Sequence, residues 1–346
     1  MTTKEELFRA ARDKVNDYEQ TVNAILSFAA FVVHDGKSRR PHSKFGIGRR
    51  MTTSQNNSVS PDSKITPDLV AQKSLEYGIV AEAKKTLNQN QSNWISHVEQ
   101  LRKYDDKLEG WWTEDQRIAH ADTIMLIHQS RVRPFTRFFQ HQKEINPDFV
   151  GPNTCVVEFA HSGETVPYYF FRLELGDIPD NELGPRLEDG VNVPLDNVRI
   201  SFPSIQYYDA KPPIPLLLFR LWTDVFPSML EDGEHDEKTG LMKIQVSVPN
   251  ITDELQKAFG SKALGRDNRS GEFPKQKWVR EAFEQLISYK LAIPRSGEDG
   301  EYIIYYRTFR DDVLDRFIKL ESEKSDVKKV TVPEKQLSMF SDVDKP

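Results

Sequence analysis

Apolar residues recur at steps of three and four positions from Lys4 to about Val33, without an intervening glycine or proline. That spacing places them on one side of a helix, so the sequence predicts one long amphipathic helix. Two shorter apolar runs follow, at residues 65–71 and 78–84, and their β-branched residues predict strands. The chain is therefore expected to begin with a helix that leads into a pair of neighbouring strands.

Further elements extend this N-terminal region. A helix is predicted from Asn93 to about Leu108 and a strand at 123–128, which completes an α/β unit that we expect to end near residue 145. Two apolar segments that flank His161 to Glu164 predict a hairpin, and proline is frequent beyond it. The expected boundaries are 1–145 for an N-terminal domain and 146–212 for a β-rich connector.

The C-terminal third has a different pattern. Helices are predicted at 216–230, 252–259 and 275–291, and a hairpin is predicted around Gly297 to Gly300. This order of helices followed by a β-wing resembles a winged-helix α+β domain, in which the third helix would be the recognition helix. After Glu321 the composition is charged and poor in aromatic residues, which predicts a disordered tail. The expected boundaries are 213–320 for this domain and 321–346 for the tail.

Composition limits the class of protein. The chain has 346 residues and 38% hydrophobic content, enough for a core in more than one domain. Its single cysteine, Cys155, excludes an internal disulfide and a cysteine-rich zinc cluster, and fits a reducing cytosol. No apolar run reaches the roughly 20 residues that a bilayer requires, and the N-terminus lacks a signal-peptide plan. We therefore expect a soluble cytoplasmic protein with no membrane partner.

The net charge of −6 indicates that any DNA-binding surface must be a local concentration of cations. Residues 36–61 contain no acidic side chain, so we expect a basic loop that contacts phosphates, the alternative being a mere connector. A second candidate surface is the start of the predicted recognition helix. The cations of the loop are Lys37, Arg39, Arg40, Lys44, Arg49 and Arg50, and those of the helix are Lys275, Lys277 and Arg280.

Three charged side chains interrupt the first two predicted strands, at Asp68, Glu82 and Lys84. Isolated ionised groups are costly to bury, so such positions indicate a metal ion or a charged substrate. Side chains two apart on a strand share a face, and pairing of the two strands would bring Asp68 to about 5 Å from that face. Two carboxylates can then share a divalent ion. The alternative is a strand end whose charges reach solvent.

Pro67-Asp68 followed by Glu82-Ala83-Lys84 resembles the motif of the PD-(D/E)XK nuclease superfamily, over roughly residues 15 to 130. The resemblance implies a restriction-endonuclease-like α/β core, with a mixed central sheet flanked by helices. It also implies that Asp68, Glu82 and the carbonyl of Ala83 hold Mg²⁺, for which Mn²⁺ can substitute, and that Lys84 orients or activates the attacking water. Oxygen ligands suit Mg²⁺, which polarises the phosphate and lowers the pKa of bound water.

A third acidic residue commonly comes from the preceding helix in that superfamily, and Glu19 is the candidate here, with Asp17 as the fallback. Gln100 and Tyr104 are similar to the QxxxY motif of the RecB-like branch. Residues four apart share one face of a helix, so both can reach the same DNA strand or an active-site carboxylate. The alternatives are an exposed helical glutamate and a solvated helix face with a packed tyrosine.

The polar tail contains one apolar peptide, Gln336-Leu337-Ser338-Met339-Phe340. It resembles the QL(S/D)LF peptide by which bacterial proteins dock on the DNA polymerase sliding clamp, with methionine in place of the usual leucine. An extended peptide can insert its apolar side chains into pockets of a partner, and methionine conserves the volume and flexibility of leucine. The alternative is a segment that folds back on the protein.

These features predict a Mg²⁺-dependent DNA endonuclease that hydrolyses phosphodiester bonds in DNA repair, restriction or antiviral defence, and that is recruited to the sliding clamp. No GxxxxGK[ST] phosphate loop is present, so any ATP-driven translocation would come from a partner. Two alternatives stay open at this point. One is a catalytically inactive DNA-binding adaptor, and the other is a winged-helix regulator.

Overall fold

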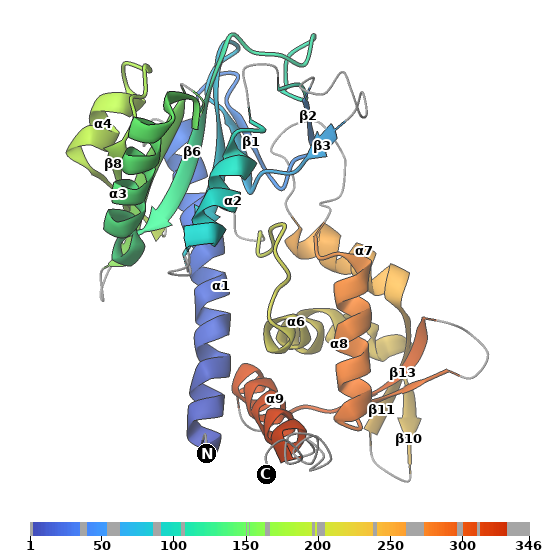
Figure 1. The fold of residues 1–346 in the computed structure, drawn as a ribbon. Coiled ribbons are helices and arrows are strands. Elements are labelled where there is room, and N and C mark those ends of the chain that lie inside the picture. Colours follow the sequence, from blue (N-terminus) through green and yellow to red (C-terminus); the bar gives the residue numbers. More distant parts are fainter. Residues whose placement is uncertain are drawn as a thin grey trace, which may run out of the picture. The chain divides into compact units, whose positions relative to one another are not determined.

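A computed structural model of the chain divides into two compact units (Figure 1). The first comprises Asp17–Lys211 and Thr252–Lys275, and the second comprises Met1–Asn16, Pro212–Ile251 and Gln276–Pro346. The structure describes residues 3–34, 40–53, 63–85, 91–104, 108–149, 151, 153–162, 167–195, 198, 205–237, 241–260, 273–295, 300–309 and 312–330.

The first unit contains a mixed seven-stranded sheet with the order β1-β4-β5-β6-β7-β8-β9. β5, β6 and β7 run parallel to one another, and the other neighbouring strands are antiparallel. The strands are β1 (Lys44–Ile47), β4 (Leu69–Gln72), β5 (Tyr77–Lys84), β6 (His120–His128), β7 (Thr154–Ser162), β8 (Tyr168–Leu175) and β9 (Val191–Pro194). A separate pair is formed by β2 (Met51–Thr53) and β3 (Ser63–Ile65).

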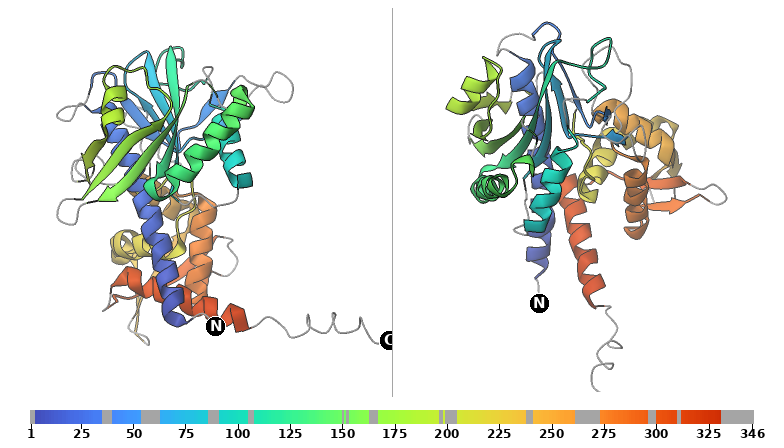
Figure 2. Two further views of the ribbon diagram at one scale, coloured as in Figure 1. Left: turned by 60° about the vertical axis from the view of Figure 1, so that its left-hand side comes forward. Right: turned by 45° about the horizontal axis from the view of Figure 1, so that its top comes forward.

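One face of this sheet is covered by α2 (Gln91–Leu101) and α3 (Gln129–Ile145), as Figure 2 shows. The apolar stripes of both helices meet the strands in one cluster, in which Val98 of α2 and Phe135 of α3 are fully buried. The short 3-10 helix η1 (Pro147–Phe149) follows α3. The helical periodicity of these segments is thus satisfied by burial against the sheet.

The opposite face of the sheet is covered by α1 (Lys4–Val33) from Asp17 onward (Figure 2). The ring of Phe28 lies 5.2 Å from that of Phe171 on β8, and the hydroxyl of Tyr169 donates to the carbonyl of Gln20 at 3.0 Å. A further helix, α4 (Leu183–Asp189), packs beside β8. The predicted α/β class, with a mixed sheet flanked by helices, is therefore confirmed.

The sheet continues past residue 145, where the sequence predicted the end of the first domain. β7 returns parallel to β6, and β8 and β9 extend the sheet, so much of the predicted connector 146–212 belongs to it. α3 makes this possible, because a parallel neighbour requires a long crossover connection. The predicted boundaries 1–145 and 146–212 are corrected accordingly: the first unit extends to Lys211.

Two strands lie within the stretch 36–61 that the sequence predicted as a loop. β1 is the edge strand of the main sheet, with Phe45 and Ile47 buried, and β2 pairs with β3. These strands have only four and three residues, so their apolar pattern is too short to stand out among the surrounding cations. The prediction of an uninterrupted loop is therefore wrong.

The second unit contains a four-stranded antiparallel sheet with the order β10-β11-β13-β12. Its core includes Trp222, whose ring stacks on those of Tyr306 and Phe309. The predicted C-terminal hairpin is present as β12 and β13. The strands are β10 (Glu234–Asp236), β11 (Leu241–Ser247), β12 (Ala292–Pro294) and β13 (Glu301–Tyr306).

Helices surround the aromatic core of the second unit. They are α6 (Ile214–Arg220), a π-helical turn η2 (Leu221–Val225), a 3-10 helix η3 (Phe226–Asp232), α7 (Val248–Phe259), α8 (Gln276–Ser288) and α9 (Val313–Val330). The division between the units passes through α1 and α7, so each of these helices contributes to both. None of the described helices is long and apolar enough to cross a membrane.

α9 passes through residue 321, where the sequence predicted the start of a disordered tail. Phe317 and Ile318 are fully buried in its first half, and α6 packs against the helix. Helix propagation from this packed base costs less than starting a new helix, so the charged residues that follow remain helical. The predicted start of the tail at residue 321 is therefore wrong. Residues 331–346, with the predicted clamp-binding peptide, lie outside the described residues.

Candidate active site

Asp68 and Glu82 face each other across two antiparallel strands. β4 and β5 pair with Val70 opposite Val80, and the same register puts Asp68, one residue before β4, opposite Glu82. Val70 and Val80 are buried under α2 and α3. Because side chains alternate along a strand, Asp68, Glu82 and Lys84 share that face. The arrangement predicted from the strand pattern is therefore confirmed.

Hydrogen bonds fix both buried carboxylates. Asp68 is 2% exposed, and its Oδ2 accepts from the backbone nitrogen of Ala83 at 2.7 Å. Glu82 is 1% exposed; its Oε1 accepts from the hydroxyl of Tyr104, and its Oε2 lies 3.3 Å from Nζ of Lys84. The carboxylates are thus held in place by the backbone of β5 and by one phenol and one ammonium.

Gln100 and Tyr104 reach this site together. Nε2 of Gln100 donates to the hydroxyl of Tyr104 at 3.3 Å, and that hydroxyl donates to Glu82. The geometry differs from the predicted one, because α2 ends at Leu101 and Tyr104 lies in the turn that follows. Of the two expected contacts, a DNA strand or an active-site carboxylate, the structure provides the carboxylate.

Asp209 is a further acidic residue at the site, and no sequence pattern singles it out. Its carboxyl group lies near enough to that of Asp68 to raise the pKa of Asp209. It belongs to an Asp-x-Lys triplet with Lys211, but that spacing is frequent in this chain and no apolar strand surrounds it. We call Asp68, Glu82, Lys84 and Asp209 the acid-rich site.

Burial and mutual repulsion shift the pKa values of the residues in the acid-rich site. Burial and the charge of Glu82 raise the pKa of Asp68 to about 6. Burial and the contact with Asp68 raise the pKa of Asp209 to about 8. Burial also raises the pKa of Glu82, although Lys84 and Tyr104 favour its ionised form. Burial would lower the pKa of Lys84, but the surrounding carboxylates raise it. Lys84 thus lies among three acids, and Lys275 is a second cation that acts on Asp209.

Lys275 lies close to the acid-rich site. Its Nζ is 5.4 Å from the centre of the Phe273 ring, and this ring packs so closely on Gly48 that a Cβ there would come within 2.2 Å of it. The backbone nitrogen of Gly48 donates to the carbonyl of Asp68 at 3.1 Å. Burial raises the pKa of Asp209, and Lys275 is among the charges that lower it. A predicted DNA-contacting cation is thus next to the carboxylates.

The structure places Glu19, the predicted third acid, on α1. This helix covers the face of the sheet opposite to Asp68 and Glu82, and the neighbouring Asp17 forms an ion pair with Lys85 at 2.5 Å. The groups that chiefly shift the pKa of Asp68 are Glu82, Lys84, Asp209 and the Ala83 amide. Participation of Glu19 stays a prediction from the resemblance.

The donor set suits a hard divalent cation. Asp68 and Glu82 supply carboxylate oxygens on one face, beside Ala83, and the negative charge exceeds what Lys84 can balance. In the part of the chain that the structure describes, no three His, Cys, Asp or Glu side chains are already arranged around a common point to hold an ion. Neither the predicted trio of Glu19, Asp68 and Glu82 nor the set of Asp68, Glu82 and Asp209 therefore forms such a group.

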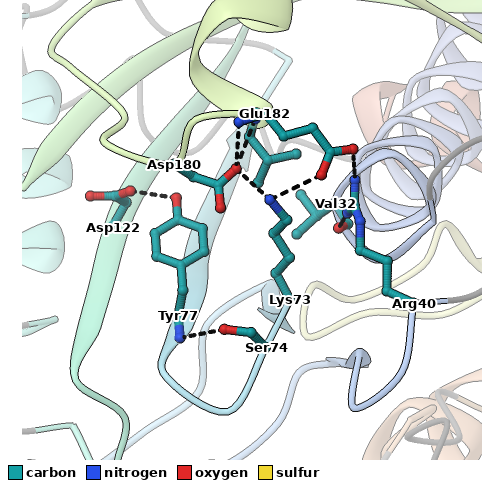
Figure 3. Close-up of polar contacts among 9 residues, drawn as sticks. Val32, Arg40, Lys73, Ser74, Tyr77, Asp122, Asp180 and Glu182 are labelled. Carbon is teal, nitrogen blue, oxygen red and sulfur yellow. Dashed lines mark hydrogen bonds and ion pairs between the residues drawn. The ribbon is translucent and has the colours of Figure 1, made fainter.

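Arg40, one of the predicted phosphate contacts, belongs to a different charged cluster (Figure 3). Its guanidinium bonds to Glu182 and to the carbonyl of Val32. Nζ of Lys73 bonds to Asp180 and lies 3.2 Å from Glu182. We call Arg40, Lys73, Asp180 and Glu182 the balanced cluster, because it has two cations for two acids. The side chain of Arg40 is 11% exposed, so it serves this cluster rather than a surface.

The other predicted cations have varied surroundings. The guanidinium of Arg49 stacks 4.0 Å from the Trp112 ring centre, and its Nε donates to the carbonyl of Gly110 at 2.7 Å. On α8, Lys277 is exposed and Arg280 is half-buried. Lys44 is half-buried, Arg50 is exposed, and Lys37 and Arg39 lie outside the described residues.

Comparison with known proteins identified no relative of this chain. No family model, no curated protein and no solved structure matched the chain. Assignment of a function therefore rests on the motif residues and on the geometry of the site.

Proposed function

We propose that this chain is a divalent-metal-dependent deoxyribonuclease with a restriction-endonuclease-like core. The observation that carries the proposal is a pair of fully buried carboxylates, Asp68 and Glu82, on one face of the sheet with Lys84. Buried negative charge in excess of its counter-ions is costly unless a cation binds. Oxygen donors of this kind favour Mg²⁺ or Mn²⁺.

Each of these residues has a proposed role in phosphodiester hydrolysis. Asp68 and Glu82 would hold the ion, with the carbonyl of Ala83 as a further donor. When bound, the ion polarises the scissile phosphate and makes its bound water more acidic. The ammonium of Lys84 would orient the attacking water and offset the negative charge that develops on the phosphate. The hydroxyl of Tyr104 fixes the Glu82 carboxylate and so keeps the donors in place.

The test is cleavage of supercoiled plasmid and of single-stranded DNA by the full chain with Mg²⁺ or Mn²⁺. We expect Lys84→Gln to lower the initial rate by about 100-fold or more, because one charge-stabilising group is lost. Lys143→Gln, which removes an exposed lysine from α3, is the matched control and should cut like the wild type. Cleavage by Lys84→Gln at the wild-type rate would reject the proposal.

A second candidate is a DNA-binding adaptor that does not cut. It is favoured by the hydrogen bonds of Glu82, because its two carboxylate oxygens already have partners in Tyr104 and Lys84. The lack of a ready three-residue metal group in the described part of the chain points the same way. If the wild type binds duplex or single-stranded DNA but cuts neither with Mg²⁺ nor with Mn²⁺, the adaptor is the correct assignment.

We also infer that DNA is contacted by cations near the acid-rich site. Lys275 is the leading residue, because the Phe273 ring supports its side chain beside the carboxylates. We further propose that the second unit is a winged helix whose α8 contacts DNA through Lys277 and Arg280. Phosphate contacts of this kind add affinity without sequence specificity. Lys275→Gln should therefore weaken binding to unrelated DNA sequences alike, in a filter-binding assay at fixed salt.

The sliding clamp is the proposed protein partner, through residues 336–340. Replacement of both Leu337 and Phe340 by alanine removes two of the side chains that would enter apolar pockets. We expect the affinity of the full chain for a bacterial clamp to fall more than about tenfold, as measured by surface plasmon resonance. Val343→Ala, in the same tail, is the control. Equal affinities for all three proteins would exclude this peptide as the docking site.

A further inference from the structure

Lys44 and Gln72 lie side by side at the edge of the main sheet. Gln72 is the last residue of β4, and the register places Lys44 of β1 directly opposite it. Directly opposite residues of an antiparallel pair point to the same face, with Cβ atoms about 5 Å apart. Because side chains alternate along β4, this is also the face that carries Asp68 and Val70. Lys44 and Gln72 therefore share a face with the acid-rich site.

The indole of Trp112 lies beside this pair. Its backbone nitrogen donates to Oε1 of Gln72 at 3.0 Å, and the guanidinium of Arg49 stacks on its ring. A Cβ added to Gly46, two residues after Lys44 on β1, would lie 3.5 Å from Cζ2 of the indole. Cζ2 belongs to the edge of the ring that carries Nε1. The indole N–H is therefore on the β1 side of the ring, near Lys44.

These three residues offer hydrogen-bond donors without matching acceptors. Gln72 is fully buried, and its Nε2 has no hydrogen-bond partner among the described residues; the same holds for the buried Nε1 of Trp112. Lys44 is half-buried, and its ammonium forms no ion pair within the described part of the chain. Buried donors are normally paired, so such a group indicates a ligand with negatively charged oxygen acceptors. We call Lys44, Gln72 and Trp112 the donor-rich site.

We propose that the donor-rich site binds a phosphate group of the DNA strand whose scissile ester occupies the acid-rich site. The inference rests on the proposed nuclease function and adds a phosphate contact that the motif does not contain. Phosphate oxygens accept from ammonium, amide and indole N–H groups alike and supply the negative charge. Gln72 and Asp68 are four residues apart on one strand, about 13 Å, which corresponds to about four steps along one strand of a duplex.

The edge of the sheet provides the route between the two sites. β1 is the edge strand, and Lys44 and Trp112 are only half-buried, so the donor-rich site is approached from this side. After the other end of β1, the backbone nitrogen of Gly48 donates to the carbonyl of Asp68 at 3.1 Å. A DNA backbone that follows β1 from Gly48 to Lys44 therefore passes from the acid-rich site to the donor-rich site.

The test is the affinity of the full chain for a fluorescein-labelled DNA duplex in EDTA, measured by fluorescence anisotropy. Lys44→Gln removes the charge, and Trp112→Phe removes the indole N–H but retains a ring for Arg49. We expect each variant to bind about three- to tenfold more weakly, and Lys44→Gln to lower the slope of log Kd against log salt concentration by about one. Lys143→Gln, on an exposed lysine of α3, is the matched control. Lys44→Arg retains the charge and should keep most of the affinity.

A second measurement distinguishes DNA from a free phosphate compound. Orthophosphate is titrated into the wild type and into Lys44→Gln by isothermal titration calorimetry. If orthophosphate binds only the wild type while both proteins bind DNA equally, the site serves a free phosphate compound and the inference is overturned. Lys44 lies on an edge strand and is half-buried, so this variant keeps the test decisive even if Trp112→Phe fails to fold.

The outcomes separate this inference from the proposed function. Weaker DNA binding and a lower salt slope in Lys44→Gln, with Lys143→Gln like the wild type, support the inference. Wild-type affinity and slope in Lys44→Gln overturn it and leave the nuclease proposal standing, because that proposal is tested by cleavage in Lys84→Gln. If the wild type binds no DNA, the inference is overturned and cleavage alone decides the proposed function.

Discussion

The two ends of β4 carry charged clusters that differ in the ratio of cations to acids. The balanced cluster beyond Gln72 has two cations for two acids, whereas the acid-rich site before Leu69 has three acids around Lys84. Burial opposes ionisation of Asp180, but the hydrogen bonds from Lys73 and from two backbone amides lower its pKa. At the other end, burial raises the pKa of Asp68 to about 6.

The comparison shows that burial of a charged cluster does not by itself indicate whether the cluster stabilises the fold or binds a ligand. Both clusters are largely removed from water, but bonds to cations lower the pKa of the acids in the balanced cluster, whereas burial and repulsion raise the pKa of Asp68 and Asp209. Ion pairs that are complete serve to hold segments together, as between Lys73 and the turn before α4. A site whose charges remain in excess is less favourable for folding and is suited to bind something positive. The same kinds of substitution should therefore have opposite consequences at the two ends.

The largest effect is expected on DNA cleavage. Asp68→Asn should lower the cleavage rate on the order of 1000-fold, because a metal ligand at the point of reaction is lost. Asp180→Asn is the same substitution at the other end of β4, and it should leave the rate of the folded protein unchanged. Initial rates at equal concentrations of folded protein provide the measurement. A similar loss in both variants would remove the functional distinction between the clusters.

The next effect is expected on stability. Lys73→Met should lower the free energy of unfolding by about 2 kcal/mol, because it leaves Asp180 and Glu182 with Arg40 as their remaining described cation. Urea denaturation followed by tryptophan fluorescence measures the change. Lys143→Met serves as the control for loss of an exposed lysine on α3. A change in Lys73→Met no larger than in the control would show that the balanced cluster adds no stability.

A smaller effect of opposite sign is expected in the acid-rich site. With EDTA present, Asp209→Asn should leave the free energy of unfolding unchanged or raise it by about 1 kcal/mol, because it removes one of three repelling acids. The same urea titration measures it. A decrease of more than about 1 kcal/mol would mean that Asp209 stabilises the fold, and the site would then resemble the balanced cluster.

The smallest effect is expected on the pH dependence of stability. Despite burial, bonds to cations lower the pKa of Asp180 and Glu182, so their contribution is lost as pH falls below the ordinary values of 3.8 and 4.5. The raised pKa values of Asp68 and Asp209, about 6 and about 8, act in the opposite direction: in EDTA, stability declines as pH rises through that range.

Two variants separate these contributions in urea titrations at pH 3.5, 5 and 8. Lys73→Met should reduce the loss of the free energy of unfolding between pH 5 and pH 3.5. Asp209→Asn should reduce its decline between pH 5 and pH 8. If either variant showed the same pH dependence as the wild type in its own pH range, the corresponding cluster would not control stability in that range.

Much of the first unit could be predicted from local patterns. The helix from Lys4 to Val33 follows from its periodicity, and the common face of Asp68 and Glu82 follows from strand alternation. The contact of Tyr104 with Glu82 was among the expected outcomes, although the helix ends before it. These predictions succeed because they depend on residues that are neighbours in sequence or on adjacent strands.

Other features could not be predicted in this way. The hairpin of β7 and β8 was predicted, but its place in the main sheet and the strand β9 required knowledge of how the chain crosses back to the sheet. The role of Arg40 required Glu182 as its partner. The triplet Asp209-Ala210-Lys211 looks like several others in the chain. Lys275 was expected to contact DNA from a recognition helix, but the structure places it beside Asp209.

The sequence by itself determined the long first helix and the central strands of the first unit, and which charges interrupt those strands. Repeats of 3.6 and 2 residues are properties of a few consecutive positions, so they can be read without a fold. Only the tertiary structure decided that Asp209 meets Asp68 and that Lys73 meets Asp180. These contacts depend on loop closure and on burial by residues distant in the sequence, and no local repeat encodes them.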